Sequence, residues 1–200
     1  MPRPQRYKIK NVPQLVMQLS HNRLPCFYDG QDYQLFQQWL HDITQRYNCT
    51  LDAYALLPDR IFLLLSSSDE SGISKMLQTL GRKYTQYINQ RYRRFGTLWS
   101  GRYYACLVEP NEPYLSECRH FVVDAALRCS LILPENKWPW QSKNEFAGPQ
   151  FPAQSLAIEQ TLRAGLVWSS LEFKNDVSVT FGVKTMPSPR GRPIQQIRSN

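Results

Sequence analysis

The stretch AYALLPDRIFLLLS, from Ala53 to Ser66, consists of two short apolar runs separated by Pro58-Asp59. Apolar runs of this length around a proline-containing turn predict a strand, a tight turn and a second strand. The second run, from Ile61 to Leu65, is apolar at every position. This pattern predicts a strand in the centre of a sheet, with both of its faces covered. Such a strand is a rigid support on which functional side chains can be held.

Helical and strand patterns surround this hairpin in an order that predicts the fold class. Apolar residues recur at helical spacing from Gln31 to Tyr47 and from Ser71 to about Tyr92. We expect a first strand over Val12 to Leu19, a later strand that ends at Val108-Glu109, and a third helix that opens at Pro110. The order predicts an α/β (α+β) fold, an antiparallel or mixed sheet with helices on one face.

The composition of the chain changes near Gly148, and we divide the chain there. Residues 1–147 contain the predicted sheet and its helices. Residues 148–183 form a C-terminal extension, with a short helix over Ser155 to Trp168 and a candidate strand over Val177 to Val183. Residues 184–200 are rich in proline, glycine and arginine, which predicts a flexible basic tail.

The charge of the chain favours a polyanionic partner. Its 200 residues include 24 lysines and arginines against 16 acidic residues, for a net charge of +8 and a pI near 9.4. A diffuse basic surface without a partner is the alternative. No apolar run approaches the roughly 18–20 residues of a membrane span, and no apolar signal segment opens the chain. We therefore expect no membrane partner.

The five cysteines indicate a reducing environment. Their number is odd and no two of them form a CxxC pair. They are typical of reduced core residues, which predicts a cytoplasmic protein.

Several short motifs occur in an order that matches a known family. Leu57 to Leu64 reads LPDRIFLL, Gly96 to Tyr103 reads GTLWSGRY, and Lys137 to Ser142 reads KWPWQS. These motifs resemble those of the REP-associated tyrosine transposases, a branch of the single-tyrosine HUH transposases. That family carries Met-Pro-Asn-His-Val-His-Leu-Leu at the first position and Gly-x-Leu-Trp-x-Gly-Arg-Tyr at the second. The resemblance covers about residues 12–142 and implies a ferredoxin-like HUH domain over residues 1–147.

The positions that carry the chemistry in that family are replaced in this chain. The family binds Mg²⁺ or Mn²⁺ through two histidines that are two residues apart on a strand, and here these positions are Arg60 and Phe62. Neither side chain offers a lone pair to a metal. On the same alignment the nucleophilic tyrosine is Phe121 and an assisting asparagine is Ala125. The resemblance thus implies a domain without catalytic residues, metal ligands or cofactor.

A relocated nucleophile is the remaining enzymatic alternative. Five tyrosines lie in or beside the second helix and its continuation: Tyr84, Tyr87, Tyr92, Tyr103 and Tyr104. One of them could attack a phosphate in an active transposase with rearranged residues. The competing interpretation is that they are core or rim aromatic residues, which ordinary burial preferences favour.

The stretch from Ser71 to Val108 has the composition of a nucleic-acid interface. It contains no acidic residue, and aromatic residues alternate with its basic ones. This combination suits phosphates flanked by stacked bases. The alternative is a solvated helix face whose charge partners lie on other elements. Lys75 belongs to this basic stretch, and the residues that we predict to bind DNA are Arg82, Lys83, Arg91, Arg93, Arg94 and Arg102.

The tail carries a second DNA-binding signal. Residues 189–193 read PRGRP, which resembles the core of an AT-hook. In that resemblance Arg190 and Arg192 lie in a narrow A·T minor groove, Gly191 allows close approach, and Pro193 keeps the segment extended. A plain disordered tail is the alternative.

Taken together, the sequence predicts a transposase-like protein that binds hairpin or single-stranded DNA and does not cut it. We expect it in the cytoplasm, associated with the nucleoid, and an active transposase paralogue is a candidate partner. The alternatives are an active transposase with relocated residues, a protein-interaction scaffold that binds no DNA, and a decayed gene product that folds without a function.

Overall fold

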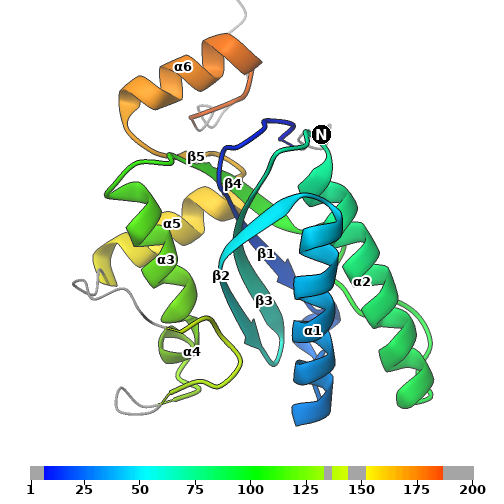
Figure 1. Ribbon diagram of the computed structural model, residues 1–200. Helices are drawn as coiled ribbons and strands as arrows, with labels where there is room; N and C mark the ends of the chain where they lie inside the picture. Colours follow the sequence, from blue (N-terminus) through cyan, green and yellow to red (C-terminus); the bar gives the residue numbers. More distant parts are fainter. Residues whose placement is uncertain (1–6, 133–136, 144–151, 187–200) are drawn as a thin grey trace, which may run out of the picture.

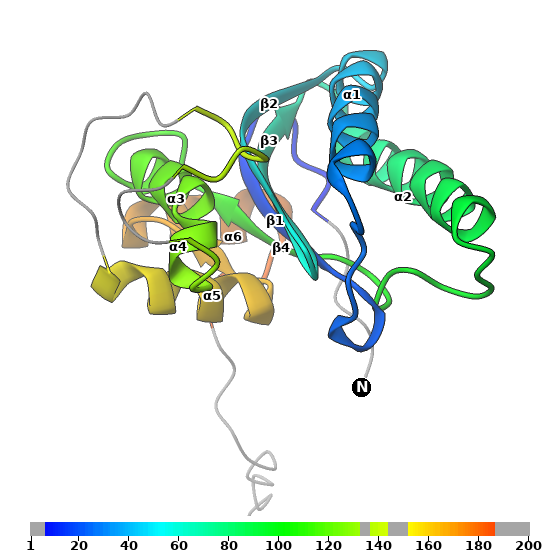
Figure 2. The ribbon, with the colours of Figure 1, turned by 90° about the horizontal axis from the view of Figure 1, so that it is seen from below.

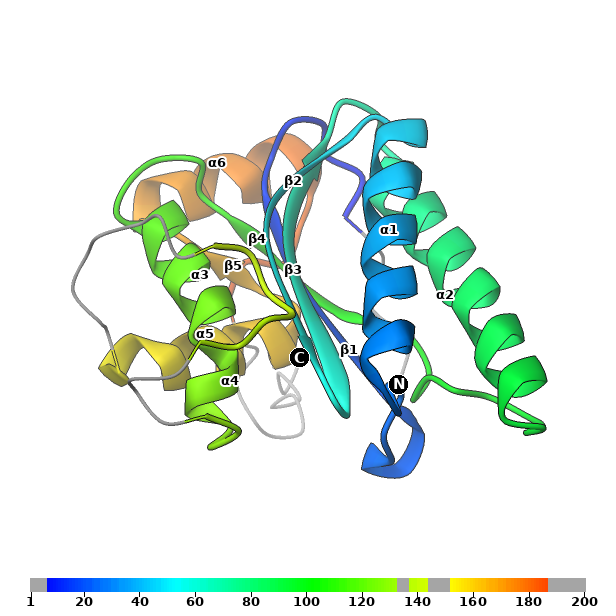
Figure 3. The same ribbon diagram turned by 60° about the horizontal axis from the view of Figure 1, so that its bottom comes forward.

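The computed structural model describes residues 7–132, 137–143 and 152–186. These residues form three layers, in which a mixed β-sheet lies between two sets of helices (Figures 1 and 3). The predicted α+β class with a mixed sheet is therefore confirmed.

The predicted hairpin forms two neighbouring strands of the sheet, with β2 at the edge and β3 between β2 and β1. β2 and β3 pair antiparallel around Pro58-Asp59, and β1 pairs antiparallel with both β3 and β4. β5 is parallel to β4, and the strand order is β2-β3-β1-β4-β5. The bounds of the strands are Gln14–Leu19 (β1), Cys49–Leu57 (β2), Arg60–Ser67 (β3), Tyr104–Val108 (β4) and Val167–Trp168 (β5).

Helices cover both faces of the sheet rather than one face as predicted (Figure 2). Alternate residues of β3 point to opposite layers: Ile61 and Leu63 belong to the core beneath α1 and α2, and Phe62 and Leu64 to the core beneath α3, α4 and α5. A strand that is apolar at every position requires both layers. The bounds are Gly30–Arg46 (α1), Gly72–Arg91 (α2), Tyr114–Val123 (α3), Ala125–Arg128 (α4) and Pro152–Ala164 (α5).

The C-terminal extension contributes to the same sheet. α5 packs against β1 and β4, and Val167–Trp168 adds the fifth strand, so the predicted helix over 155–168 ends earlier, at Ala164. The boundary that we predicted between residues 147 and 148 lies outside the described residues.

The strand predicted over Val177 to Val183 is wrong, because Leu171–Phe181 forms helix α6. The side chain of Ser170 accepts a hydrogen bond from the backbone N–H of Phe173 and caps the start of the helix. Gly182 adopts a left-handed conformation with φ of 61° and ends it. These local caps outweigh the β-branched residues that suggested a strand.

All five cysteines are free, and four of them are buried. In the described ranges, every helix is too short or too polar to cross a bilayer.

Candidate nucleic-acid interface

A groove of about 1070 Å³ runs between helix α2 and the segment from Thr97 to Tyr103. Its deepest lining residues include Phe36 and Leu80, which are buried apolar side chains. Its polar lining comes from both walls and from the end of β1: Gln18, His21, Ser74, Gln78, Arg82, Thr85, Gln86, Thr97, Ser100 and Arg102. The groove therefore has an apolar floor and a polar, basic rim.

Close packing fixes the second wall of the groove. The indole of half-buried Trp99 lies on α2 and donates a hydrogen bond from Nε1 to the carbonyl of Gly81 at 3.3 Å. A Cβ at Gly81 would lie 3.4 Å from that nitrogen, so a side chain there would press on the indole. The wall is also tied to the end of β1, because the backbone of Ser100 donates to Leu19 and that of His21 to Leu98.

The groove is electropositive. Arg82 is exposed on α2, Arg102 is exposed on the opposite wall, and among the described residues that line the groove none is acidic. Two guanidinium groups across a groove with polar amides between them suit a polyanionic chain. Two of the residues predicted to bind DNA are thus brought together.

Sequence reasoning missed the amides and hydroxyls of this groove. Ser74, Gln78, Arg82 and Gln86 are spaced four residues apart, so they form one polar stripe along α2. The stripe adjoins the apolar positions that pack on the sheet. This spacing could have identified the wall that α2 forms. The wall formed by residues 97–103 has no such periodic signal.

Lys83, Arg93 and Arg94 are not among the residues that line the groove. The Lys83 ammonium on α2 lies 4.1 Å from the centre of the Trp39 ring on α1, in a cation–π contact between the two helices. Arg93 and Arg94 follow the end of α2, where Arg94 donates to the hydroxyl of Tyr28 at 2.8 Å. The AT-hook-like residues Arg190, Gly191, Arg192 and Pro193 lie outside the described residues.

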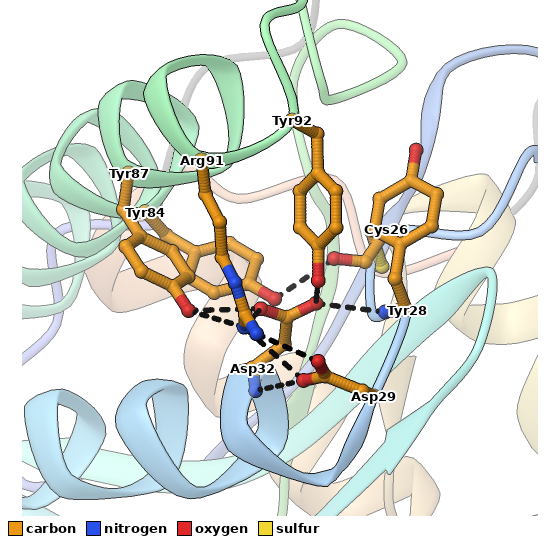
Figure 4. Close-up of polar contacts among 8 residues, drawn as sticks. All are labelled: Cys26, Tyr28, Asp29, Asp32, Tyr84, Tyr87, Arg91 and Tyr92. Atoms are coloured by element: carbon orange, nitrogen blue, oxygen red, sulfur yellow. Dashed lines mark hydrogen bonds and ion pairs between the residues drawn. The ribbon is translucent and has the colours of Figure 1, made fainter.

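A buried carboxylate connects α1 to the C-terminal end of α2 (Figure 4). Asp32 is fully buried and accepts four hydrogen bonds. The Tyr87 hydroxyl (2.9 Å) and Nη1 of Arg91 (2.5 Å) donate to Oδ1. The backbone N–H of Tyr28 and the Tyr92 hydroxyl, each at 2.8 Å, donate to Oδ2. The network spans residues 28 to 92 and fixes one end of the two-helix layer.

Arg91 belongs to this network and not to a free basic face. Its Nη2 also lies 2.7 Å from Oδ2 of Asp29, the residue that caps α1. Desolvation acts to lower the pKa of Arg91, but hydrogen bonds to Asp29, Tyr87 and Asp32 outweigh it and raise that pKa above its ordinary value. The stretch from Ser71 to Val108 has no acidic residue, yet α1 supplies two for Arg91. For Arg91, the alternative that its charge partners lie on another element is therefore correct.

Three of the four residues that the resemblance aligns with catalytic positions, Phe62, Phe121 and Ala125, lie in the opposite core. The rings of Phe62 on β3 and Phe121 on α3 are 5.5 Å apart in an edge-to-face contact, and both are almost completely buried. Ala125 is fully buried in the same cluster. The guanidinium of Arg128 lies 3.8 Å from the centre of the Phe121 ring and donates to the carbonyl of Phe121. Phe62 and Phe121, which the resemblance aligns with a metal-binding histidine and the nucleophilic tyrosine, pack against each other.

Charged residues at the edge of this core are paired with one another. Nε and Nη2 of Arg60 contact the two carboxylate oxygens of Asp59 at 2.9 and 2.8 Å, and Arg23 reaches the same carboxylate at 2.9 Å. Partial burial acts to raise the pKa of Asp59, but Arg60 and Arg23 outweigh it and lower that pKa below its ordinary value. The β2–β3 turn therefore carries a closed ion cluster.

These side chains do not fit the divalent metal that the resemblance implies. Arg60 stays protonated and Phe62 has no donor atom, so neither supplies a lone pair. Asp59 is engaged by two arginines, and the described residues contain no group of three or more histidine, cysteine or acidic side chains that could hold a metal ion.

Three of the five candidate tyrosine nucleophiles have structural roles. Tyr84 is fully buried and its hydroxyl donates to the carbonyl of Cys26 at 2.8 Å, while Tyr87 and Tyr92 donate to Asp32. Burial, and for the latter two the bond to Asp32, raises the pKa of each phenol above its ordinary value. A raised pKa opposes formation of the attacking phenolate. The hydroxyl of Tyr103 lies 3.1 Å from the hydroxyl of Ser74 at the groove.

Two solved structures are similar to this chain. The chain is similar to the structure of a REP-associated tyrosine transposase bound to a REP hairpin, with 12% identity over 76% of this chain and 94% of that chain and a TM-score of 0.61. It is also similar to a Deinococcus radiodurans protein described as a candidate transposase, with 18% identity, 61% and 95% coverage and a TM-score of 0.41. No curated protein sequence matches.

The first of these likenesses shows a shared fold. A family model described as "Transposase IS200 like" matches residues 10–123, which include β1 to α3 and both walls of the groove. The match covers more than half of the chain, and the chain therefore belongs to the family of IS200-like transposases.

Proposed function

We propose that this chain binds hairpin or single-stranded DNA in the groove between α2 and residues 97–103, and that it does not cleave the strand. The observation that carries the proposal is the groove itself, with Arg82 and Arg102 on opposite walls and uncharged polar side chains between them. The similar transposase of known structure is bound to a REP hairpin, which supports a folded-back DNA strand as the ligand here.

The groove suits a strand whose bases are accessible. Guanidinium groups bind phosphates through several N–H donors, and the amides of Gln78 and Gln86 can bond to the edges of unpaired bases. Half-buried Trp99 offers an aromatic surface at the wall. A regular duplex hides these base edges within its pairs, so the structure favours single-stranded or hairpin DNA over linear duplex.

The absence of strand cleavage is supported by the chemistry of the replaced positions. Phe121 has no hydroxyl with which to form a link to phosphate, and Arg60 and Phe62 cannot ligate a metal. A protein that binds the hairpin without cutting it would regulate or organise DNA of the nucleoid, or would act with an active transposase paralogue. The AT-hook-like tail would add a contact to an adjacent minor groove.

One titration tests the proposal. Electrophoretic shifts are measured with a hairpin, a linear single strand and a duplex of the same length, each with and without Mn²⁺. We expect a salt-dependent preference for the hairpin or single strand, unchanged by metal, with the DNA left intact. Absence of a shift on all three nucleic acids would refute DNA binding. Metal-dependent nicking would refute the loss of cleavage and would favour a relocated active site.

Neutralising the groove should weaken that binding. Arg82→Gln and Arg102→Gln are each expected to raise Kd roughly tenfold near 0.1 M salt and to lower the salt slope by about one unit, because each removes one phosphate contact. Arg163→Gln on α5 is the matched control, since it removes the same charge from the opposite helical layer. Equal losses in all three variants would indicate a general charge effect and no specific groove.

A further inference from the structure

The turn after α2 displays an aromatic ring to solvent. Phe95 is 95% exposed, the highest value among the exposed large apolar residues in the described part of the chain. Burying such a side chain is worth about 1.5–3 kcal/mol, and the isolated domain forgoes this gain. Nearly the whole surface of this ring is therefore available for contact with a ligand.

The exposure of Phe95 results from an ordered turn. The backbone N–H of Arg94 donates to the carbonyl of Asn89 at 2.9 Å, and the side-chain amide of Asn89 donates to the carbonyl of Gly96 at 3.0 Å. Gly96 has φ of 89° and Arg93 has φ of 50°, both in the left-handed region. The residues on either side of Phe95 are thus held by Asn89, and the ring projects from a fixed backbone.

The network at Asp32 anchors the same turn from the inside. Tyr92 donates to Asp32, and its ring packs 4.5 Å from the ring of Tyr28 (Figure 4). Arg94 donates to the hydroxyl of Tyr28. The backbone that carries Phe95 is therefore held by side-chain hydrogen bonds of this domain, and no ligand is needed to order it. Such preorganisation reduces the entropy that binding must overcome.

The surroundings of Phe95 indicate what covers it. Exposed Arg93 and half-buried Arg94 precede it, and Thr97, two residues later, already lines the groove. The stretch from Ser71 to Val108 contains no acidic residue. An aromatic ring that follows two cationic side chains and precedes a residue of an electropositive groove matches a polyanion that carries flat apolar rings.

We propose that Phe95 stacks on an unpaired nucleobase of the bound DNA, where the strand leaves the groove. This inference rests on the proposed function and adds to it the residue that recognises the unpaired part of the strand. A phenyl ring has no hydrogen-bonding atom, so the contact would tolerate any base and would select unpaired over paired nucleotides. Arg93 and Arg94 would hold the flanking phosphates.

The test uses the full chain and hairpins with unpaired nucleotides beside the stem, each carrying 2-aminopurine at one unpaired position. Wild type is expected to quench the fluorescence of the probe at one or two adjacent positions. Phe95→Ala should abolish the quenching and raise Kd about tenfold, with the salt slope unchanged, because stacking is lost and phosphate contacts are kept.

Two further variants separate stacking from mere apolar contact. Phe95→Trp should restore both quenching and affinity to within about twofold, and Phe95→Leu should restore neither, since leucine lacks a π face. Phe181→Ala on α6, another exposed phenylalanine, is the control and should match wild type.

The outcomes distinguish the two proposals. If wild type binds none of the DNAs, the proposed function fails and the role of Phe95 fails with it. If wild type binds and Phe95→Ala binds equally with the same quenching, only the role of Phe95 is refuted. Full rescue by Phe95→Leu would also refute stacking.

Discussion

Replacement of Asp32 by asparagine is expected to lower the free energy of unfolding by about 3 kcal/mol. The carboxylate is fully buried and both of its oxygens accept two hydrogen bonds. Asparagine offers one acceptor oxygen and one NH₂ donor in the same space, so two of the four donors would face another donor. Because water does not reach this position, the lost bonds are not replaced by solvent.

Asp29→Asn is the matched control for this variant. Asp29 contacts the same arginine from the surface and caps α1, and asparagine caps a helix as well as aspartate does. An exposed ion pair of this kind is worth about 1 kcal/mol or less. Urea unfolding followed by tryptophan fluorescence gives both values. Equal stabilities for the two variants would mean that the buried carboxylate has no special part in holding α1 to α2.

The same network shows why part of the candidate site could not be predicted. The sequence places Arg91 in a stretch without acidic residues, and local composition alone indicates a cation free for phosphate. Its partners, Asp29 and Asp32, are about sixty residues earlier, and only the packing of α1 on α2 brings them together. Long-range pairing of this kind leaves no periodic signal. The structure places Arg82 and Arg102 at the groove.

The elements with strong local patterns were predicted closely. The hairpin around Pro58-Asp59 and the two long amphipathic helices lie where the apolar spacing places them. The layer arrangement was predicted less well, although the continuous apolar run of β3 already requires cover on both faces. The second layer comes from α3, α4 and α5, which are shorter than α1 and α2 and separated by irregular segments. Their apolar positions give a weaker helical signal, and α5 lies in what composition marked as a separate extension.

Replacement of Phe62 by alanine is expected to lower the free energy of unfolding by about 3–5 kcal/mol. The ring is 1% exposed and contacts Phe121 edge to face in the core between β3 and α3. Its removal loses buried apolar area and leaves a cavity that fixed strands cannot close. This is the position that would carry a metal-binding histidine on the family alignment, where a polar, accessible site would tolerate truncation far better.

Phe95→Ala is the matched control, because the same substitution at an exposed ring should change stability by less than about 0.5 kcal/mol. A double-mutant cycle with Phe121→Ala should give a coupling of about 0.5–1.5 kcal/mol, as expected for an aromatic pair. If Phe62→Ala does not fold, Phe62→Leu, with an expected loss of about 1–1.5 kcal/mol, serves in its place. If Phe62→Ala did not change the free energy of unfolding, the packed core would be contradicted and an accessible active site at this position would be favoured. A large loss would mean that Phe62 stabilises the fold through its packing, and that its replacement by histidine would lower the stability of the protein.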